Sequence, residues 1–235
     1  HQARRLTMGI QSASLNVMRA AAEKAGRALR RDFGEIEKLQ VSQKGPGDFV
    51  TNADLKAESI IREELQTARP GYGLLMEESG EIEGSDKTHR WIVDPLDGTT
   101  NFMHGIPHFA ISIALEREGR LVSGLIYNPV TDELFLAERG QGAFSHNTRL
   151  RVSGRSRISD AVFACGAPHG ERAGRNEFIT EMETLLPKVA GIRRFGAAAL
   201  DLAYVAAGRD AGFWERGLAP CDMAAGLGIC REARA

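Results

Sequence analysis

The sequence predicts a layered fold of the α/β or α+β class. Helical and strand-like apolar patterns alternate along the chain, strand patterns concentrate between residues 73 and 137, and no internal repeat or low-complexity linker interrupts them. With 235 residues, 43% hydrophobic and 26% charged, the composition is typical of a folded domain. We therefore expect one domain over residues 1–235, with a soft subdivision near residues 150–160.

The first third of the chain predicts two amphipathic helices. Apolar residues recur every three or four positions up to about Asp32, at Leu15, Met18, Ala22, Ala25 and Leu29. Residues 39–51 contain the turn signal Lys44-Gly45-Pro46-Gly47, which predicts a short strand, a turn and a second strand. A second helix is expected over residues 53–67, with Ile60, Ile61 and Leu65 facing inward, and Pro70-Gly71 ends it.

The remaining elements follow from a change of period. Strands are expected at residues 74–76, 91–93, 109–115, 121–127 and 133–136. Turn residues at 119–120 and 129–132 predict that the last three form an antiparallel meander. Further strands are expected at 161–165, 192–195 and 211–214, and helices at 174–186, at 197–207 and from about 222.

Composition and charge exclude several classes of protein. The formal net charge is −1, so the chain lacks the basic excess of a general binder of nucleic acids or anionic membranes. It has no apolar run near the roughly 20 residues that span a membrane, and no signal core follows His1 to Met8. Cys165, Cys221 and Cys230 are an odd number without CxxC spacing, which predicts reduced thiols and a cytoplasmic location.

Three acidic groups each follow a predicted strand. They are Glu77-Glu78, the pair Asp94 and Asp97, and Asp222. Pro95 cannot continue a central strand, so we expect the backbone to turn directly after Asp94 and aim both aspartates inward. The segment 98–101 resembles a helix start, whose free N–H groups favour an anion such as phosphate.

Convergence of these carboxylates requires a cation among them. Two carboxylates about 4 Å apart repel by roughly 4 kcal/mol at an effective dielectric of about 20. An all-oxygen donor set suits Mg²⁺ or Mn²⁺ rather than Zn²⁺, and such ions beside a phosphate-ready helix start indicate metal-assisted phosphoester hydrolysis. The alternative is that Asp94 and Asp97 are ordinary turn residues and Glu77-Glu78 a solvated loop.

At these residues the chain resembles the inositol monophosphatase family, most closely the bacterial inositol-1-monophosphatases. The block Asp94-Pro-Leu-Asp-Gly-Thr-Thr-Asn-Phe102 is the most specific match, and the likeness runs from about residue 10 to the end. The matching segments are 48–54, 77–80, 91–102, 195–202 and 214–226. The resemblance implies an αβαβα sandwich, two to three Mg²⁺ ions with Mn²⁺ as a substitute, lithium sensitivity and a homodimer.

Site residues are implied by the resemblance position by position. Glu77, Asp94 and the Leu96 carbonyl would hold the first Mg²⁺, and Asp94, Asp97 and Asp222 the second, with Glu77 also touching a third ion. Thr99 and Asp54 would orient and deprotonate the attacking water. The N–H groups of Gly98 and Thr99 would hold phosphate. Substrate hydroxyls would face Asp97, Arg193, Gly196, Ala198, Glu215 and Asp222.

Some of these residues have a structural explanation as well. Thr51 and Asp54 are natural caps for the start of the second helix. Arg193 and Arg194 fit a solvated basic pair, and His104 and His108 fit a solvent-facing loop without a ligand role.

The chain departs from the family pattern in three places. Cys221 stands where Trp is usual, Ala197 where Ser or Thr is usual, and the chain ends where the family normally continues, as a truncated chain would. None of these departures removes an expected metal ligand.

The expected activity is Mg²⁺-dependent hydrolysis of inositol-1-phosphate or a similar small polyol phosphate. Fructose-1,6-bisphosphate, a 3′-phosphoadenosine nucleotide and histidinol phosphate are alternative substrates, because enzymes for them share the metal core. A different alternative is a regulatory partner in transcription antitermination that associates with RNA polymerase or nucleic acid. The basic run from Arg149 to Arg157 would serve that role, although a solvated face also explains it.

Overall fold

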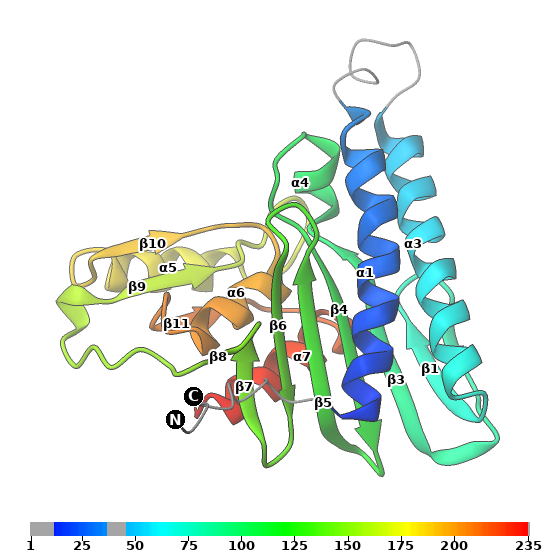
Figure 1. Ribbon diagram of the computed structural model, residues 1–235. Coiled ribbons are helices and arrows are strands. Elements are labelled where there is room, and N and C mark those ends of the chain that lie inside the picture. The colour runs from blue at the N-terminus through cyan, green and yellow to red at the C-terminus, as the bar shows by residue number, and fades with distance from the viewer. Residues whose placement is uncertain (1–11, 37–45, 235) are drawn as a thin grey trace, which may run out of the picture.

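A computed structural model describes residues 12–36 and 46–234, with side chains from residue 51 onward in the second range. Its elements form five layers in the order α, β, α, β, α (Figure 1). Helices α1 (Ala13–Phe33) and α3 (Pro46–Ala68) cover one face of an eight-stranded sheet. Helices α6 (Ala198–Ala206) and α7 (Pro220–Glu232) separate that sheet from a three-stranded one, and α5 (Arg175–Leu185) covers the outer face.

The large sheet has the strand order β2-β1-β3-β4-β5-β6-β7-β8. Its strands are β1 (Tyr72–Met76), β2 (Gly80–Ile82), β3 (Asp86–Asp97), β4 (Ala110–Arg117), β5 (Arg120–Asn128), β6 (Glu133–Glu138), β7 (Gly142–Ser145) and β8 (Thr148–Arg149). Only β1 and β3 pair in parallel within it, and β4, β5 and β6 form the predicted antiparallel meander. The small sheet, β10-β9-β11, is parallel throughout, with bounds Val162–Cys165 for β9, Gly191–Arg193 for β10 and Gly212–Trp214 for β11.

Helix α1 shows how the apolar pattern positions an element. The five residues that predict it are all buried, and its N-cap Ser12 accepts a hydrogen bond from the N–H of Leu15 at 3.1 Å. The helix packs on β4 and β5 and beside α3, whose Ile61 and Leu65 join the same core.

The central helix α7 lies very close to the large sheet. A Cβ atom at Gly124 of β5 would come within 2.8 Å of the Ala225 carbonyl oxygen of α7. Glycine at this point of the strand therefore permits the close approach.

Two sequence expectations were wrong in detail. Residues 46–51 belong to α3 rather than to a strand, because proline is favoured in the first turn of a helix, while residues 39–45 of that prediction lie outside the described residues. Strand β3 also continues through Pro95 to Asp97 instead of turning after Asp94, although its register with β4 shifts there. Pairing between β1 and β3 ends at Val93, so the missing N–H of Pro95 breaks no bond to β1.

None of the described helices combines the length and the apolar character that crossing a bilayer demands.

Candidate active site

Three carboxyl groups from distant parts of the chain meet at one point. Glu77 follows β1, Asp94 lies in β3, and Asp222 lies in the first turn of α7. Each offers an oxygen, and these oxygens all lie within 4.8 Å of one another. The backbone N–H of Glu77 bonds to the Val93 carbonyl at 3.2 Å, which fixes the end of β1 beside Asp94.

Asp97 adds a fourth carboxylate at the end of β3. Its Oδ2 accepts a hydrogen bond of 2.7 Å from the N–H of Ala199, in the first turn of α6. Burial raises the pKa of Asp97 to about 7, the Ala199 N–H opposes the rise, and the charges of Asp222 and Glu77 add to it. The Asp97 carboxylate therefore connects the end of β3 to the first turn of α6.

Electrostatic repulsion within the cluster is large. The pKa of Asp94 is raised well above its ordinary value, first by burial and then by the charge of Asp97. The pKa of Glu77 is also raised, mainly by burial and further by Asp222, while a hydrogen bond to Asp94 opposes the rise. Within the described part of the chain, no lysine, arginine or histidine forms an ion pair with any of the four carboxyls.

This donor set fits hard divalent cations. Holding four charged carboxylates together costs free energy, and cations bound among them reduce that cost. Mg²⁺ and Mn²⁺ prefer coordination by oxygen atoms alone. Leu96 lines the same cleft, and its N–H donates to Asp94 Oδ1 at 3.0 Å, which holds the Leu96 backbone beside the cluster.

The turn after β3 leads into a short helix, α4 (Thr99–Met103), as the sequence predicts. Gly98 precedes it with φ 90°, a left-handed conformation that glycine adopts without strain. Asn101 fixes the turn, since its amide donates to the carbonyls of His108 at 2.8 Å and Phe195 at 2.7 Å. The Gly98–Thr99 backbone is thereby held at the edge of the cleft.

A further acidic residue, Glu58, holds the loop that carries Glu77, and it was not predicted from the sequence. The buried carboxylate of Glu58 accepts hydrogen bonds from the N–H of Glu78 at 2.9 Å and of Ser79 at 3.1 Å, and from the Ser79 hydroxyl. These contacts hold the loop that carries Glu77. The apolar pattern of the helix could have indicated this role. Glu58 lies on the same helix face as the buried Ala57 and Ile61, where an ionised side chain needs a hydrogen-bond partner.

Asp54 lies one turn before Glu58 on α3. It is buried, and its Oδ1 has no hydrogen-bond partner among the described residues. Burial, followed by the charges of Glu78 and Glu77, raises its pKa to about 8. Asp54 thus lies behind the carboxylate cluster rather than on the wall of the cleft.

The cluster forms one end of a cleft of about 440 Å³. Of the predicted site residues, those on its wall are Glu77, Asp94, Leu96, Asp97, Gly98, Thr99, Gly196, Ala198, Glu215 and Asp222. Arg193 is not on the wall, and the neighbouring Arg194 is. The Arg193 guanidinium instead donates to the Ile192 carbonyl at 3.1 Å and its charge acts on Asp210.

The opposite end of the cleft mixes basic and acidic groups. Arg172 lies 3.7 Å from Glu215, and Arg194 lowers the pKa of Glu215, although burial has the larger effect and raises it. Asp201 of α6 also lines this end, and burial together with the charge of Asp97 raises its pKa to about 8. This end can therefore both donate to and accept from a polar ligand.

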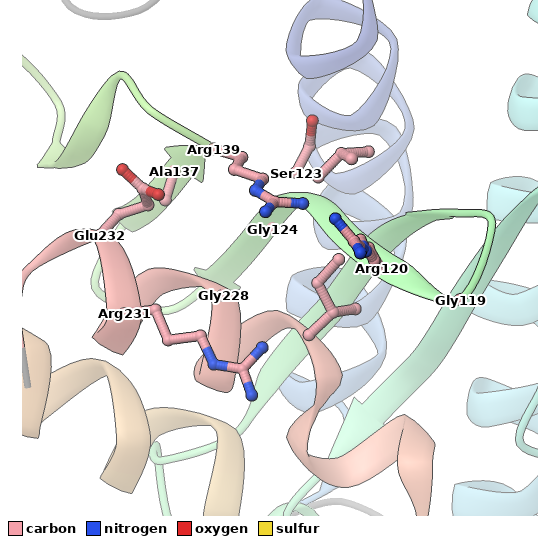
Figure 2. Close-up of a pocket in the computed structure, with 11 residues that line it drawn as sticks. Gly119, Arg120, Ser123, Gly124, Ala137, Arg139, Gly228, Arg231 and Glu232 are labelled. Atoms are coloured by element: carbon pink, nitrogen blue, oxygen red, sulfur yellow. The ribbon is translucent and has the colours of Figure 1, made fainter.

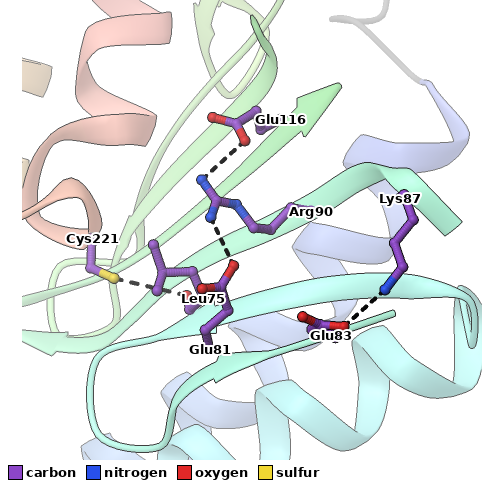
Figure 3. A network of polar contacts seen from close by, with 7 residues as sticks. All are labelled: Leu75, Glu81, Glu83, Lys87, Arg90, Glu116 and Cys221. Atoms are coloured by element: carbon purple, nitrogen blue, oxygen red, sulfur yellow. Dashed lines mark hydrogen bonds and ion pairs between the residues drawn. The ribbon is translucent and has the colours of Figure 1, made fainter. Parts of the chain in front are cut away.

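Two departures from the family pattern lie close to these residues. Cys221 is buried, and its thiol donates to the Leu75 carbonyl at 3.8 Å (Figure 3). Burial, then the charges of Glu77 and Asp222, raises the pKa of Cys221 to about 11, so the thiol stays protonated at neutral pH. Ala197 is buried behind the wall, whereas Ala198 faces the cleft.

The two loop histidines do not line the cleft. His104 is exposed. The centre of the His108 ring lies 5.2 Å from that of Phe195 and 5.8 Å from that of Tyr204. Burial lowers the pKa of His108. His104 therefore agrees with the predicted solvent-facing loop, whereas His108 is half-buried and the prediction was wrong for it.

Comparison with known proteins gives consistent matches. The model of the inositol monophosphatase family matches residues 11–234. An inositol-1-monophosphatase of Mesorhizobium japonicum is 62% identical over 223 residues, which are 95% of this chain and 84% of that protein. The Nus factor SuhB of Escherichia coli is 44% identical, over 93% of this chain and 82% of that protein. The crystal structure of the extragenic suppressor protein suhB from Bartonella henselae superposes with a TM-score of 0.88 at 61% identity, covering 94% of this chain and 85% of that one.

Proposed function

Because the chain belongs to the inositol monophosphatase family, we propose that this phosphatase is Mg²⁺-dependent and hydrolyses inositol-1-phosphate or a similar small polyol phosphate. The observation that carries the proposal is that the carboxyl groups of Glu77, Asp94 and Asp222 meet in one cleft. Among the described residues, none of the three forms an ion pair with a basic side chain. The 62% identity to an inositol-1-monophosphatase supports inositol-1-phosphate as the substrate.

The acidic end would hold two to three Mg²⁺ ions, or Mn²⁺ in their place. Glu77, Asp94 and the Leu96 carbonyl would bind one, and Asp94, Asp97 and Asp222 the next, with Glu77 also reaching a third. When bound, such ions polarise the phosphate, make water a stronger nucleophile and stabilise the leaving oxygen. The position of all these groups on one cleft wall supports this assignment.

The chain itself would position the phosphate and the water. The N–H groups of Gly98 and Thr99 lie at the cleft edge and would donate to phosphate oxygens. The Thr99 hydroxyl would orient the water, and Asp54 would accept its proton through Thr99. Asp54 suits this role because it is buried and its Oδ1 has no hydrogen-bond partner among the described residues, which leaves that oxygen able to accept a proton.

Other residues of the cleft wall, together with Asp222 of the cluster, would bind the hydroxyl groups of the polyol. Glu215 and Asp222 accept hydrogen bonds from hydroxyls, while Gly196 and Ala198 leave room for the ring. Arg194 replaces Arg193 in this proposal because only Arg194 lies on the cleft wall.

A substrate panel tests the proposal. We expect phosphate release from inositol-1-phosphate with Mg²⁺, inhibition by Li⁺ and loss of turnover in EDTA. Fructose-1,6-bisphosphate, 3′-phosphoadenosine 5′-phosphate and histidinol phosphate in the same assay separate the alternative substrates. If no phosphate is released from any of the four with Mg²⁺ or Mn²⁺ present, the phosphatase proposal fails.

Arg194→Ala is expected to raise KM for inositol-1-phosphate about tenfold while changing kcat less, since a lost hydrogen bond to a charged group costs about 1.5–3 kcal/mol. Steady-state kinetics measures the change. Arg193→Ala is the matched control, because it removes the same charge one residue away and outside the wall. A larger effect of Arg193→Ala than of Arg194→Ala would contradict the assignment.

A second candidate function is a regulatory role in transcription antitermination. Nus factor SuhB of Escherichia coli is 44% identical to this chain, and Arg149, Arg151, Arg155 and Arg157 are all exposed. Co-purification with RNA polymerase would support this role, and its failure would leave the phosphatase proposal alone.

A further inference from the structure

A second cavity, of about 520 Å³, lies between β5 and the C-terminal half of α7. It shares no lining residue with the catalytic cleft. One end of α7 therefore presents Asp222 to the cleft, and the other end presents Arg231 to this second pocket.

Three arginines from different elements line the pocket. Arg120 begins β5, Arg139 follows β6 and Arg231 lies in the last turn of α7. In Figure 2 the side chains of Arg120 and Arg139 come from the strand side of the pocket and that of Arg231 from α7. Among residues 12–36 and 51–234, no carboxylate forms an ion pair with any of them.

The single acidic residue on the described wall is already engaged. The carboxylate of Glu232 accepts hydrogen bonds from the N–H groups of Gly140 at 3.0 Å and Gly142 at 2.9 Å. In Figure 2 this carboxylate points away from the guanidinium groups. The pocket therefore has an excess of positive charge that the described chain does not neutralise.

Small residues keep the space between the arginines open. A Cβ atom built on Gly228 of α7 meets no atom within 4 Å. The resulting volume of about 520 Å³ falls within the roughly 300–1,000 Å³ range of small-molecule sites. A single phosphate would occupy only part of it.

We propose that this pocket binds a small molecule that carries at least two phosphate groups. Guanidinium groups match phosphate oxygens with paired hydrogen bonds. Because the three arginines project from separate strands and a helix, one phosphate would not engage all of them, whereas a chain of phosphates would. The proposal is independent of the phosphatase activity, because none of these residues takes part in it.

Titration calorimetry with inorganic tripolyphosphate tests the proposal. EDTA keeps the protein metal-free, so the four carboxylates of the cleft repel the polyanion and the cleft competes less with the arginine pocket for it. We expect one binding site, weakened by added salt, and inorganic phosphate bound about tenfold or more weakly because fewer charged contacts form. Absence of tripolyphosphate binding, or equal affinity for phosphate, would overturn the proposal.

Three variants locate the binding. Arg139→Ala and Arg231→Ala should each weaken tripolyphosphate about tenfold or more, and Gly228→Leu should block it by filling the space without removing charge. Arg155→Ala is the matched control, since Arg155 is exposed and lines neither cavity. Circular dichroism confirms that each variant is folded. Unchanged binding in all three pocket variants, or an equal loss in Arg155→Ala, refutes the site.

Discussion

Asp94→Asn is expected to lower turnover of inositol-1-phosphate by at least about a thousandfold, because preorganised charge at the reacting phosphate accounts for effects of this size. Asp94 would be shared by two Mg²⁺ sites, and asparagine supplies a neutral oxygen where a charged one is needed. The change preserves the shape of a buried side chain, so the fold should persist. Steady-state assays at saturating Mg²⁺ measure the loss.

Stability measurements separate loss of metal from loss of fold. In EDTA the variant should be at least as stable as the wild type, because burial and neighbouring carboxylates oppose the charge of Asp94. Added Mg²⁺ should stabilise the wild type more than the variant. Asp210→Asn is the control, since Asp210 is a buried aspartate like Asp94 but does not line the cleft. Wild-type turnover in Asp94→Asn would refute the metal assignment.

Phe102→Ala is expected to reduce the free energy of unfolding by about 3–5 kcal/mol, the usual cost of removing a buried aromatic ring. Phe102 is fully buried in α4. Its ring centre lies 4.9 Å from that of Phe109, the residue before β4, and 5.6 Å from that of Phe33 at the end of α1, so it joins α4 to both segments. Urea unfolding in EDTA measures the change without a contribution from bound metal.

Activity should fall in Phe102→Ala as well, because the ring anchors the helix that begins at Thr99. Phe102→Leu fills most of the space and should cost less than half as much stability. If Phe102→Ala costs less than about 1 kcal/mol, α4 is not held by this aromatic cluster.

The sequence predicted most of the fold because burial follows simple periods. The residues that repeat every three or four positions in α1 are buried, and the meander of β4, β5 and β6 follows its turn residues. Short strands at the two ends of the large sheet were missed, since β2, β7 and β8 have three, four and two residues and too little pattern to recognise. The helical start at Pro46 was missed because proline beside glycine signals a turn as readily as a helix start.

The sequence motifs predicted which segments meet at the candidate site, but not the directions in which their side chains point. Glu77, Asp94 and Asp222 lie together, as the order of the acidic segments suggested. Arg193 is the last residue of β10, a strand of three residues, and Arg194 follows it; adjacent side chains in extended backbone point to opposite faces. Nothing in so short a strand decides which of the two enters the cleft, so the choice required the structure.

Helix α7 sets a limit on protein engineering. Because the Ala225 carbonyl leaves no room for a side chain at position 124, enlarging the contact would push the whole helix outward and carry Asp222 with it. Directed evolution aimed at new substrates would do better to diversify Arg172 and Arg194 on the cleft wall, because their side chains can change without moving the helix that carries Asp222.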